Sequence, residues 1–186
     1  NEAGAVYNTY LSSFKNEDGS VSWLPVCADA HGFLVNRGLF AKYGIPLPTD
    51  YDSFVSACQA FAKHGIRGFD ADYTYDYTCM ETLQGLSVSE LSSAEGRKWR
   101  AAYSDPANTE KVGLDDTVWP TAFKNFEQFI RDTGLNAADL TLNYDDIMDR
   151  MRGGELAMCF GSSAGVKILQ DEGIDTTCRP VPGQDG

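Results

Sequence analysis

The chain has 186 residues, of which 42% are hydrophobic and 23% charged, and its 27 acidic residues against 15 Lys and Arg give a net charge of −12. This apolar content favours a folded globular protein and excludes an intrinsically disordered one. The acidic balance excludes nucleic acid as a partner, because such a surface repels phosphate backbones. No apolar run approaches membrane-spanning length, so attachment to a membrane would need an anchor outside this sequence.

The first half of the chain is predicted to alternate short helices and strands. In chain order the predicted elements are a helix over 3–14, strands over 21–26 and 32–36, a short helix over 39–43, a helix from about 50 to 64 and a strand over 66–69. Gly44 is expected to stop the short helix, and the prolines of 45–48 hold the next segment extended. Thr49 or Asp50 can cap the helix that follows.

The second half is predicted to be richer in helices. In chain order the predicted elements are a loop over 70–77, helices over 78–86, 93–103, 118–132 and 145–152, a strand over 156–160 and a helix over 162–170. The helix over 118–132 is expected to bury Phe123, Phe126, Phe129 and Ile130. The pattern predicts an α/β fold: a helix-rich lobe with a small mixed sheet.

The cysteines give no sign of a metal site or a disulfide framework. They are Cys27, Cys58, Cys79, Cys159 and Cys178. No two form a CxxC pair and no His stands at zinc-ligand spacing from any of them, while their odd number and wide gaps argue against a framework of disulfides. One disulfide stays open. We predict no metal, no cofactor and no catalytic residue.

Three stretches of the sequence, taken in order, resemble one family. Residues 24–26 together with 32–40 are similar to its "glP … yNkdlF" stretch, 43–54 to "kaGi..P.TwdEf", and 151–158 to "F..GkaAM". With the Pro-rich ending at 179–182, their order and spacing resemble the family 1 extracellular solute-binding proteins, the receptors of carbohydrate ABC importers. Four residues depart from the pattern, and they are Asp50, Ser53, Met151 and Leu156. Asp50 can still cap a helix, and the last two keep an apolar side chain.

The resemblance implies a fold and a function for the whole chain. Residues 1–186 are expected to form a single periplasmic-binding-protein-like lobe, mostly the second of two, with hinge-proximal segments near 24–32 and 178–186. Family members capture a sugar or oligosaccharide between two lobes and deliver it to ABC permease subunits. We therefore expect a monomer outside the cell membrane, either periplasmic or held at the surface by an anchor that this excised segment lacks.

The loop over 70–77 is the first candidate for a sugar site. Sugars are bound by aromatic faces, which cover C–H patches of the ring, and by carboxylates, which accept hydrogen bonds from hydroxyls. Asp70, Asp72, Tyr73 and Tyr75 combine both chemistries between a predicted strand and a predicted helix. Asp72 and Tyr73 are the first choices. Alternatively, Tyr75 and Tyr77 simply pack the next helix.

Other candidates lie at element ends elsewhere in the chain. Asp29 and His31 stand in the loop after the first predicted strand, a region that lies near the interlobe cleft in the resembling family. Gly161 and Ser162 join a strand to a helix, where the resembling proteins often contact ligand, although a role as helix cap would also explain Ser162. Trp119 begins the long helix, where core packing is its alternative role.

Two other classes of protein stay open as alternatives. Paired acids such as Asp70 and Asp72 could belong to a glycosidase-like enzyme fragment, and the same composition suits a surface interaction or adhesion module. The sequence has no Gly-x-Ser-x-Gly elbow, P-loop or dinucleotide fingerprint. With only two His, catalysis by histidine is hard to build, so we predict a binding protein and not an enzyme.

Overall fold

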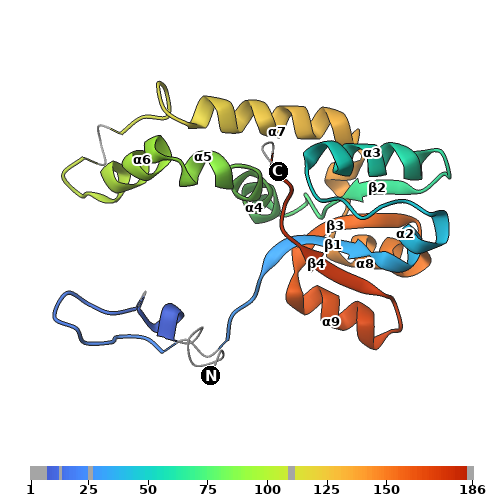
Figure 1. Ribbon diagram of the computed structural model, residues 1–186, viewed down its shortest axis with the longest axis horizontal. Helices are drawn as coiled ribbons and strands as arrows, with labels where there is room; N and C mark the ends of the chain where they lie inside the picture. The colour runs from blue at the N-terminus through green and yellow to red at the C-terminus, as the bar shows by residue number, and fades with distance from the viewer. Residues whose placement is uncertain (1–7, 13, 25–26, 109–111, 184–186) are drawn as a thin grey trace. The chain divides into compact units, whose positions relative to one another are not determined.

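The computed structural model describes residues 8–12, 14–24, 27–108 and 112–183 (Figure 1). Contacts divide the chain into two compact units, 1–30 and 31–186. The expectation that the whole chain forms one lobe stays a prediction. Among the described residues, no helix has the length and apolar content needed to cross a bilayer.

In the unit formed by residues 1–30, the described residues contain one short helical segment and one isolated bridge. Residues 8–12 are helical, which agrees with the predicted helix where that segment is described. The predicted strand over 21–26 is wrong at 21–24, where only Val21 pairs, through an isolated bridge to Lys15; residues 25–26 lie outside the described part of the chain. Trp23 and Leu24 are largely exposed, so their β-favouring side chains have no surface against which a strand would be stabilised.

The unit formed by residues 31–186 is built on a four-stranded sheet. Its strands are β1 (His31–Asn36), β2 (Arg67–Asp70), β3 (Leu156–Ser162) and β4 (Thr176–Arg179), in the order β2-β3-β1-β4. β1 pairs antiparallel with β3 and β4, whereas β2 pairs parallel with β3. The predicted small mixed sheet is therefore confirmed, with β4 as a strand that the sequence pattern did not predict.

Most of the predicted helices are confirmed. The helices of this unit are α2 (Arg37–Tyr43), α3 (Tyr51–Ala62), α4 (Asp76–Leu86), α5 (Val88–Ser92), α6 (Ala94–Ser104), α7 (Trp119–Thr133), α8 (Tyr144–Gly153), α9 (Ser163–Asp171) and the 3₁₀ turn η1 (Asp139–Thr141). Asp50 caps α3 in a capping box with Ser53, and Gly44 ends α2 in the left-handed conformation. The short α5 and η1 were not predicted.

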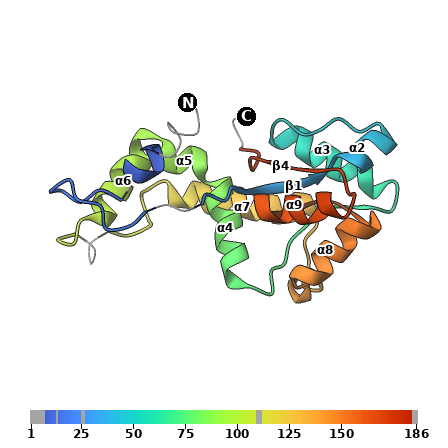
Figure 2. The ribbon, with the colours of Figure 1, turned by 90° about the horizontal axis from the view of Figure 1, so that it is seen from below.

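Two apolar cores lie against the sheet, one on each face. Successive residues of a strand point to opposite faces, so Phe33 and Val35 of β1 enter one core and Leu34 enters the other. The first core contains α3 and the end of α7, and the second contains α8 and α9. Figures 1 and 2 show β1 and β4 between α3 on one side and α8 and α9 on the other.

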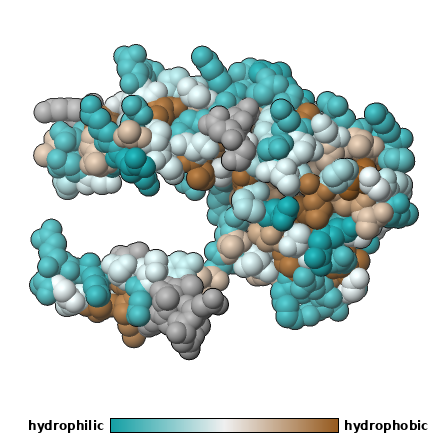
Figure 3. Space-filling view, viewed as in Figure 1, coloured by the Kyte–Doolittle hydropathy of each residue, from teal (hydrophilic) through white to brown (hydrophobic). Residues whose placement is uncertain are grey.

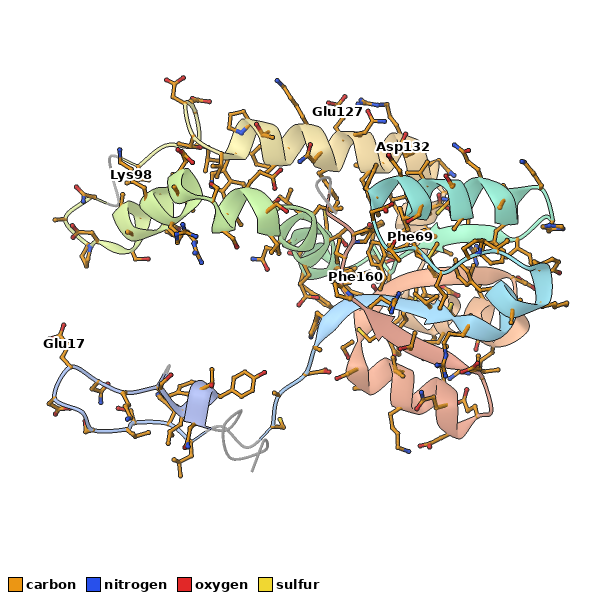
Figure 4. The ribbon with its side chains drawn as sticks, viewed as in Figure 1. Glu17, Phe69, Lys98, Glu127, Asp132 and Phe160 are labelled. Carbon is orange, nitrogen blue, oxygen red and sulfur yellow. The ribbon has the colours of Figure 1, made fainter. Side chains whose placement is uncertain are left out.

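The first core is dominated by aromatic rings. The ring centroids of Phe33 and Phe69 are 4.6 Å apart, and Phe54 stacks on Phe129 at 5.7 Å. Figure 4 shows Phe69 between the sheet and α7. Offset and edge contacts of this kind add to the burial of apolar area, so these rings fix α3 and α7 on the sheet.

The predicted buried face of α7 needs correction. Phe129 is fully buried and Phe126 is partly buried against the first core, but Phe123 is 44% exposed and Ile130 is also exposed. Phe123 is exposed because only the end of α7 covers the sheet, whereas its beginning lies with α5 and α6 in an arm that extends beyond the sheet (Figure 1). Ile130 is in the end of α7 but lines an open apolar hollow together with Phe126 and Leu135.

Candidate ligand-binding site

One edge of the sheet gathers several of the predicted site residues. β2 and β3 run parallel, so their carboxyl ends meet at the same edge, and β1 begins there because it is antiparallel to β3. His31 at the start of β1 is paired in register with Ser162 at the end of β3. The loop after Asp70 leaves β2 at this edge and leads into α4.

Two adjoining hollows lie at this edge. The first hollow, of about 140 Å³, is lined by His31, Asp72, Tyr77, Thr78, Glu81, Tyr144, Phe160, Gly161 and Ser162. The second hollow, of about 250 Å³, is lined by His31, Glu81, Gln84, Gly85, Val88, Phe160 and Val181. They share His31, Glu81 and Phe160, which therefore form the boundary between them. Figure 4 shows Phe160 where the sheet approaches α4.

The boundary between the two hollows contains a hydrogen-bonded pair of side chains, His31 and Glu81. Nδ1 of His31 lies 3.0 Å from Oε2 of Glu81, a hydrogen bond that joins β1 to α4 across 50 residues of sequence. The imidazole also packs against the ring of Phe160, at a centroid distance of 6.4 Å. Both polar side chains remain partly exposed, so each can also hydrogen-bond to a ligand.

Asp72 supplies a carboxylate at the wall of the first hollow. It is buried and accepts a hydrogen bond of 3.0 Å from the hydroxyl of Thr78, two residues inside the start of α4. Burial raises the pKa of this carboxyl above its usual value, while the hydrogen bond from Thr78 lowers it. The position of Asp72 is therefore fixed by the fold before any ligand arrives.

Two tyrosines form an exposed aromatic face beside this carboxylate. Tyr75 stacks on Tyr77 with a centroid distance of 5.4 Å and an angle of 22° between the rings, and both are exposed. Packing of α4 therefore does not account for them. Tyr77 lines the first hollow, whereas the predicted Tyr75 lines neither hollow and only stacks on Tyr77.

Gly161 and Ser162 line the first hollow at the point where β3 meets α9. Ser162 occupies the N-cap position of α9, but its side chain makes no capping hydrogen bond, so capping does not explain its hydroxyl. A Cβ at position 161 would lie 3.0 Å from Cδ1 of Leu34, so a larger residue here would need the leucine side chain to shift. Both residues line the first hollow, and their contact with a ligand stays a prediction.

Asp70 lies elsewhere, beneath the surface. Its fully buried carboxylate accepts a hydrogen bond of 3.0 Å from Arg150 and lies 3.7 Å from Nε of Arg67. Another nitrogen of Arg67, Nη2, binds Asp139 at 2.8 Å. Burial, with the neighbouring charge of Asp139, raises the pKa of Asp70 to about 6. Asp70 therefore holds β2 to α8 and lines neither hollow.

Three further predicted residues do not join the two hollows. Tyr73 packs against the first core and lines a separate apolar hollow beside α7. Trp119 lies in the arm, edge-on to Trp99 at a centroid distance of 5.3 Å. Asp29 belongs to the unit formed by residues 1–30, and its role stays a prediction.

Sequence reasoning missed five residues of the first hollow, namely Tyr77, Thr78, Glu81, Tyr144 and Phe160. Thr78 and Glu81 stand three residues apart and so share one face of α4, a spacing that could have indicated a polar wall. Tyr144 follows the Asn143 cap of α8, and only the tertiary fold brings it to this edge. None of the five cysteines, all of which the structure describes, forms a disulfide, and the described residues contain no group of three or more His, Cys, Asp or Glu suited to a metal ion.

Comparison with known proteins identifies the fold. No protein-family model matches this sequence, and neither does any curated protein. A family 1 extracellular solute-binding protein from Bifidobacterium longum subsp. infantis is 19% identical, with a TM-score of 0.68 over 95% of this chain and 44% of that one. A sugar transporter protein from Bacillus licheniformis in complex with stachyose is 17% identical, with a TM-score of 0.67 over 94% and 46%. A probable secreted solute-binding lipoprotein from Streptomyces coelicolor is 16% identical, with a TM-score of 0.71 over 94% and 43%.

The chain therefore has the fold of part of an extracellular solute-binding protein. The expected periplasmic-binding-protein-like α/β lobe and the structural resemblance to family 1 proteins are confirmed. At these identities the likeness concerns the fold and not the ligand. The chain spans less than half the length of each of the three solved proteins.

Proposed function

We propose that this chain is the sugar-capturing half of a two-lobed solute-binding protein that serves an ABC importer. The observation that carries this proposal is the first hollow, where the stacked Tyr75 and Tyr77 stand beside the carboxylates of Asp72 and Glu81. Aromatic faces cover the C–H patches of a sugar ring, and carboxylates accept hydrogen bonds from its hydroxyls. The stachyose complex of a protein with this fold supports a carbohydrate as the ligand.

The size of the hollows supports the idea of a half-site. A pocket that encloses most of a small ligand usually measures about 300–1,000 Å³, whereas the first hollow measures about 140 Å³. A ligand in it would keep much of its surface in water. A second lobe closing over the same edge would supply the missing contacts, in keeping with the greater length of the solved proteins.

The remaining parts of the proposal follow from the same role. The partners would be a sugar or oligosaccharide and the permease subunits, and the protein would act as a monomer outside the cell membrane, either in the periplasm or held to the surface by an anchor. The secreted lipoprotein from Streptomyces coelicolor supports that location. The pairing of Asp70 with Asp72 as glycosidase acids loses its support, because Asp70 is enclosed by arginines away from the hollows.

Calorimetry and thermal shift on the complete protein test the proposal. The probes are monosaccharides, the glucose-to-maltotetraose series, and sucrose, raffinose and stachyose. At least one should bind saturably and raise the melting temperature without being converted to product. The 186-residue chain alone should bind the same sugar far more weakly, because it supplies only part of the contacts.

Two substitutions locate the site. Tyr77→Ala should weaken binding roughly tenfold through loss of the aromatic face. Asp72→Asn should weaken it by roughly 10-fold to 100-fold, the range for a hydrogen bond to a charged group. Tyr103→Ala is the matched control, because Tyr103 and Tyr77 are both 54% exposed and Tyr103 lies in the arm. Turnover of a sugar would indicate an enzyme, and unchanged affinity in Tyr77→Ala would remove the first hollow from the site.

A further inference from the structure

The second hollow differs from the first in its chemistry. Beyond the shared boundary, its lining is mostly apolar, with Val88 and Val181 and a single additional polar side chain, Gln84. The first hollow carries Asp72, Thr78 and Ser162 on its own side of the boundary. A ligand long enough to pass His31 would therefore enter an apolar compartment after a polar one.

The outer wall of the second hollow is the segment that follows β4. This segment, 180–183, runs from β4 toward α4 and α5 (Figure 1). A Cβ at Gly85 would lie 2.6 Å from Cγ2 of Val181, and a Cβ at Gly183 would lie 3.2 Å from the hydroxyl oxygen of Ser89. The segment therefore rests directly on α4 and α5.

Helix formation does not account for a glycine at position 85. Glycine in a helix interior costs about 1 kcal/mol relative to alanine, and Gly85 lies inside α4. The close approach of Val181 explains it, since any larger residue would displace the valine. The position of Val181 is therefore set by α4, and its side chain has no room to move toward that helix.

Val181, together with Gly85 and Val88, lies between the second hollow and a larger space. On its other side lies a hollow of about 430 Å³, lined by Val35, Pro48, Thr49, Arg179 and the segment 180–183 among others. Gly85, Val88 and Val181 line both spaces. Figure 3 shows hydrophobic residues at the surface of the arm and beside the sheet.

We propose that Val181, seated on Gly85, is a specificity-determining residue that closes the second hollow and limits the size of the sugar unit bound there. This inference rests on the proposed function. The first hollow takes one sugar unit through hydrogen bonds and the tyrosine face. The second takes the next unit through its C–H face or an apolar substituent, and Val181 sets how far that unit extends.

Two substitutions of Val181 in the complete protein test this role in opposite directions. Val181→Ala joins the second hollow to the larger space and should raise the affinity for trisaccharides and longer chains relative to disaccharides, by roughly tenfold. Val181→Leu cannot expand toward Gly85, so its added bulk enters either the second hollow or the larger space. In the second hollow it should weaken disaccharide binding by roughly tenfold and leave monosaccharide binding unchanged, and in the larger space it should weaken the binding of longer chains relative to disaccharides.

The measurement is calorimetry with glucose, maltose, maltotriose and maltotetraose, and with sucrose, raffinose and stachyose. Val166→Ala is the matched control, a partly buried valine that packs against the second core and lines neither hollow. A change in the ratio of affinities between chain lengths in the Val181 variants alone supports the role. Equal ratios in wild type and both variants would overturn it while leaving sugar binding itself intact. If no sugar binds to the wild type, the proposed function has failed, and the inference fails with it.

Discussion

The buried carboxylate of Asp70 should make the stability of the protein depend on pH in a defined window. Its pKa is raised to about 6 in the folded state, mainly by burial and next by the charge of Asp139, against an ordinary value of 3.8. Each tenfold change in a protonation equilibrium is worth about 1.4 kcal/mol. Ionising Asp70 therefore costs up to ~3 kcal/mol more in the folded protein than in the unfolded chain.

The sign of the effect follows from the direction of the pKa change. Between pH 4 and 6 the folded protein keeps a proton on Asp70 that the unfolded chain has already released. Raising the pH through this window therefore favours the unfolded chain. The contribution of Asp70 to stability is fully present below pH 4 and is lost as the pH rises through about 6.

Asp70→Asn isolates this contribution. Unfolding by urea, followed by circular dichroism at pH values from 4 to 7, gives the free energy of unfolding of both proteins. Asn resembles the protonated carboxyl, so the variant should have about the stability of wild type near pH 4 and should exceed it at neutral pH, where wild type has ionised Asp70. The difference between wild type and variant should shift by ~3 kcal/mol across the window, to the disadvantage of wild type at higher pH. Asp145→Asn, which changes an exposed acid in the first turn of α8, should leave the pH dependence unchanged. Parallel curves for wild type and Asp70→Asn would refute the reasoning.

Two other substitutions test the packing of the sheet. Gly68→Ala should lower the free energy of unfolding by about 1–3 kcal/mol, because its Cβ would lie 2.5 Å from Cα of Cys58 and push β2 away from α3. The control is Gly153→Ala, whose Cβ would lie 3.6 Å from its nearest neighbour, Cγ of Glu155. Equal melting temperatures for the two variants would contradict the prediction. Phe129→Ala should lower the free energy of unfolding, measured in urea, by about 3–5 kcal/mol, because this buried ring contacts Phe54 and other rings of the first core. A decrease below about 1 kcal/mol would contradict this and show that the core refills the space.

The elements that were predictable carry local signals in the sequence. Gly44 adopts the left-handed conformation that ends α2, and Asp50 accepts the capping hydrogen bond from Ser53 N–H at 2.8 Å. These interactions span at most four residues, so the sequence contains both partners. Strands β1 and β3 are apolar along nearly their whole length, which is typical of strands covered on both faces.

The elements that were not predictable depend on distant partners. β4 reads Thr-Thr-Cys-Arg, without apolar alternation, and it is a strand because it pairs with β1, more than 130 residues away in sequence. Phe123 is the opposite case, a residue with a local signal for burial that the tertiary fold leaves exposed. Its spacing with Phe126 and Phe129 indicates a buried face, but the helix extends beyond the sheet that would bury it.

The residues of the candidate site also divide into those that a local sequence signal predicts and those that depend on distant partners. His31, Asp72, Gly161 and Ser162 were predictable because they flank strand ends, and the pairing of the strands brings strand ends together. Asp70 was misplaced because two acids two residues apart look alike in sequence. Only the position of Arg150 on α8 shows which of them is enclosed.

The glycines at this edge connect the stability of the lobe to the shape of its site. Gly161 lines the first hollow and Gly85 the second, and a larger residue at either position would displace a neighbour: Leu34 of the second core or Val181 of the segment after β4. A ligand therefore meets surfaces whose form is fixed by core packing. The side chains that can vary without disturbing that packing are the exposed ones, Tyr77 above all. Under the proposed function, such a lobe could change its ligand through its exposed tyrosines while the sheet and its two cores stay the same, because the site and the fold depend on different residues.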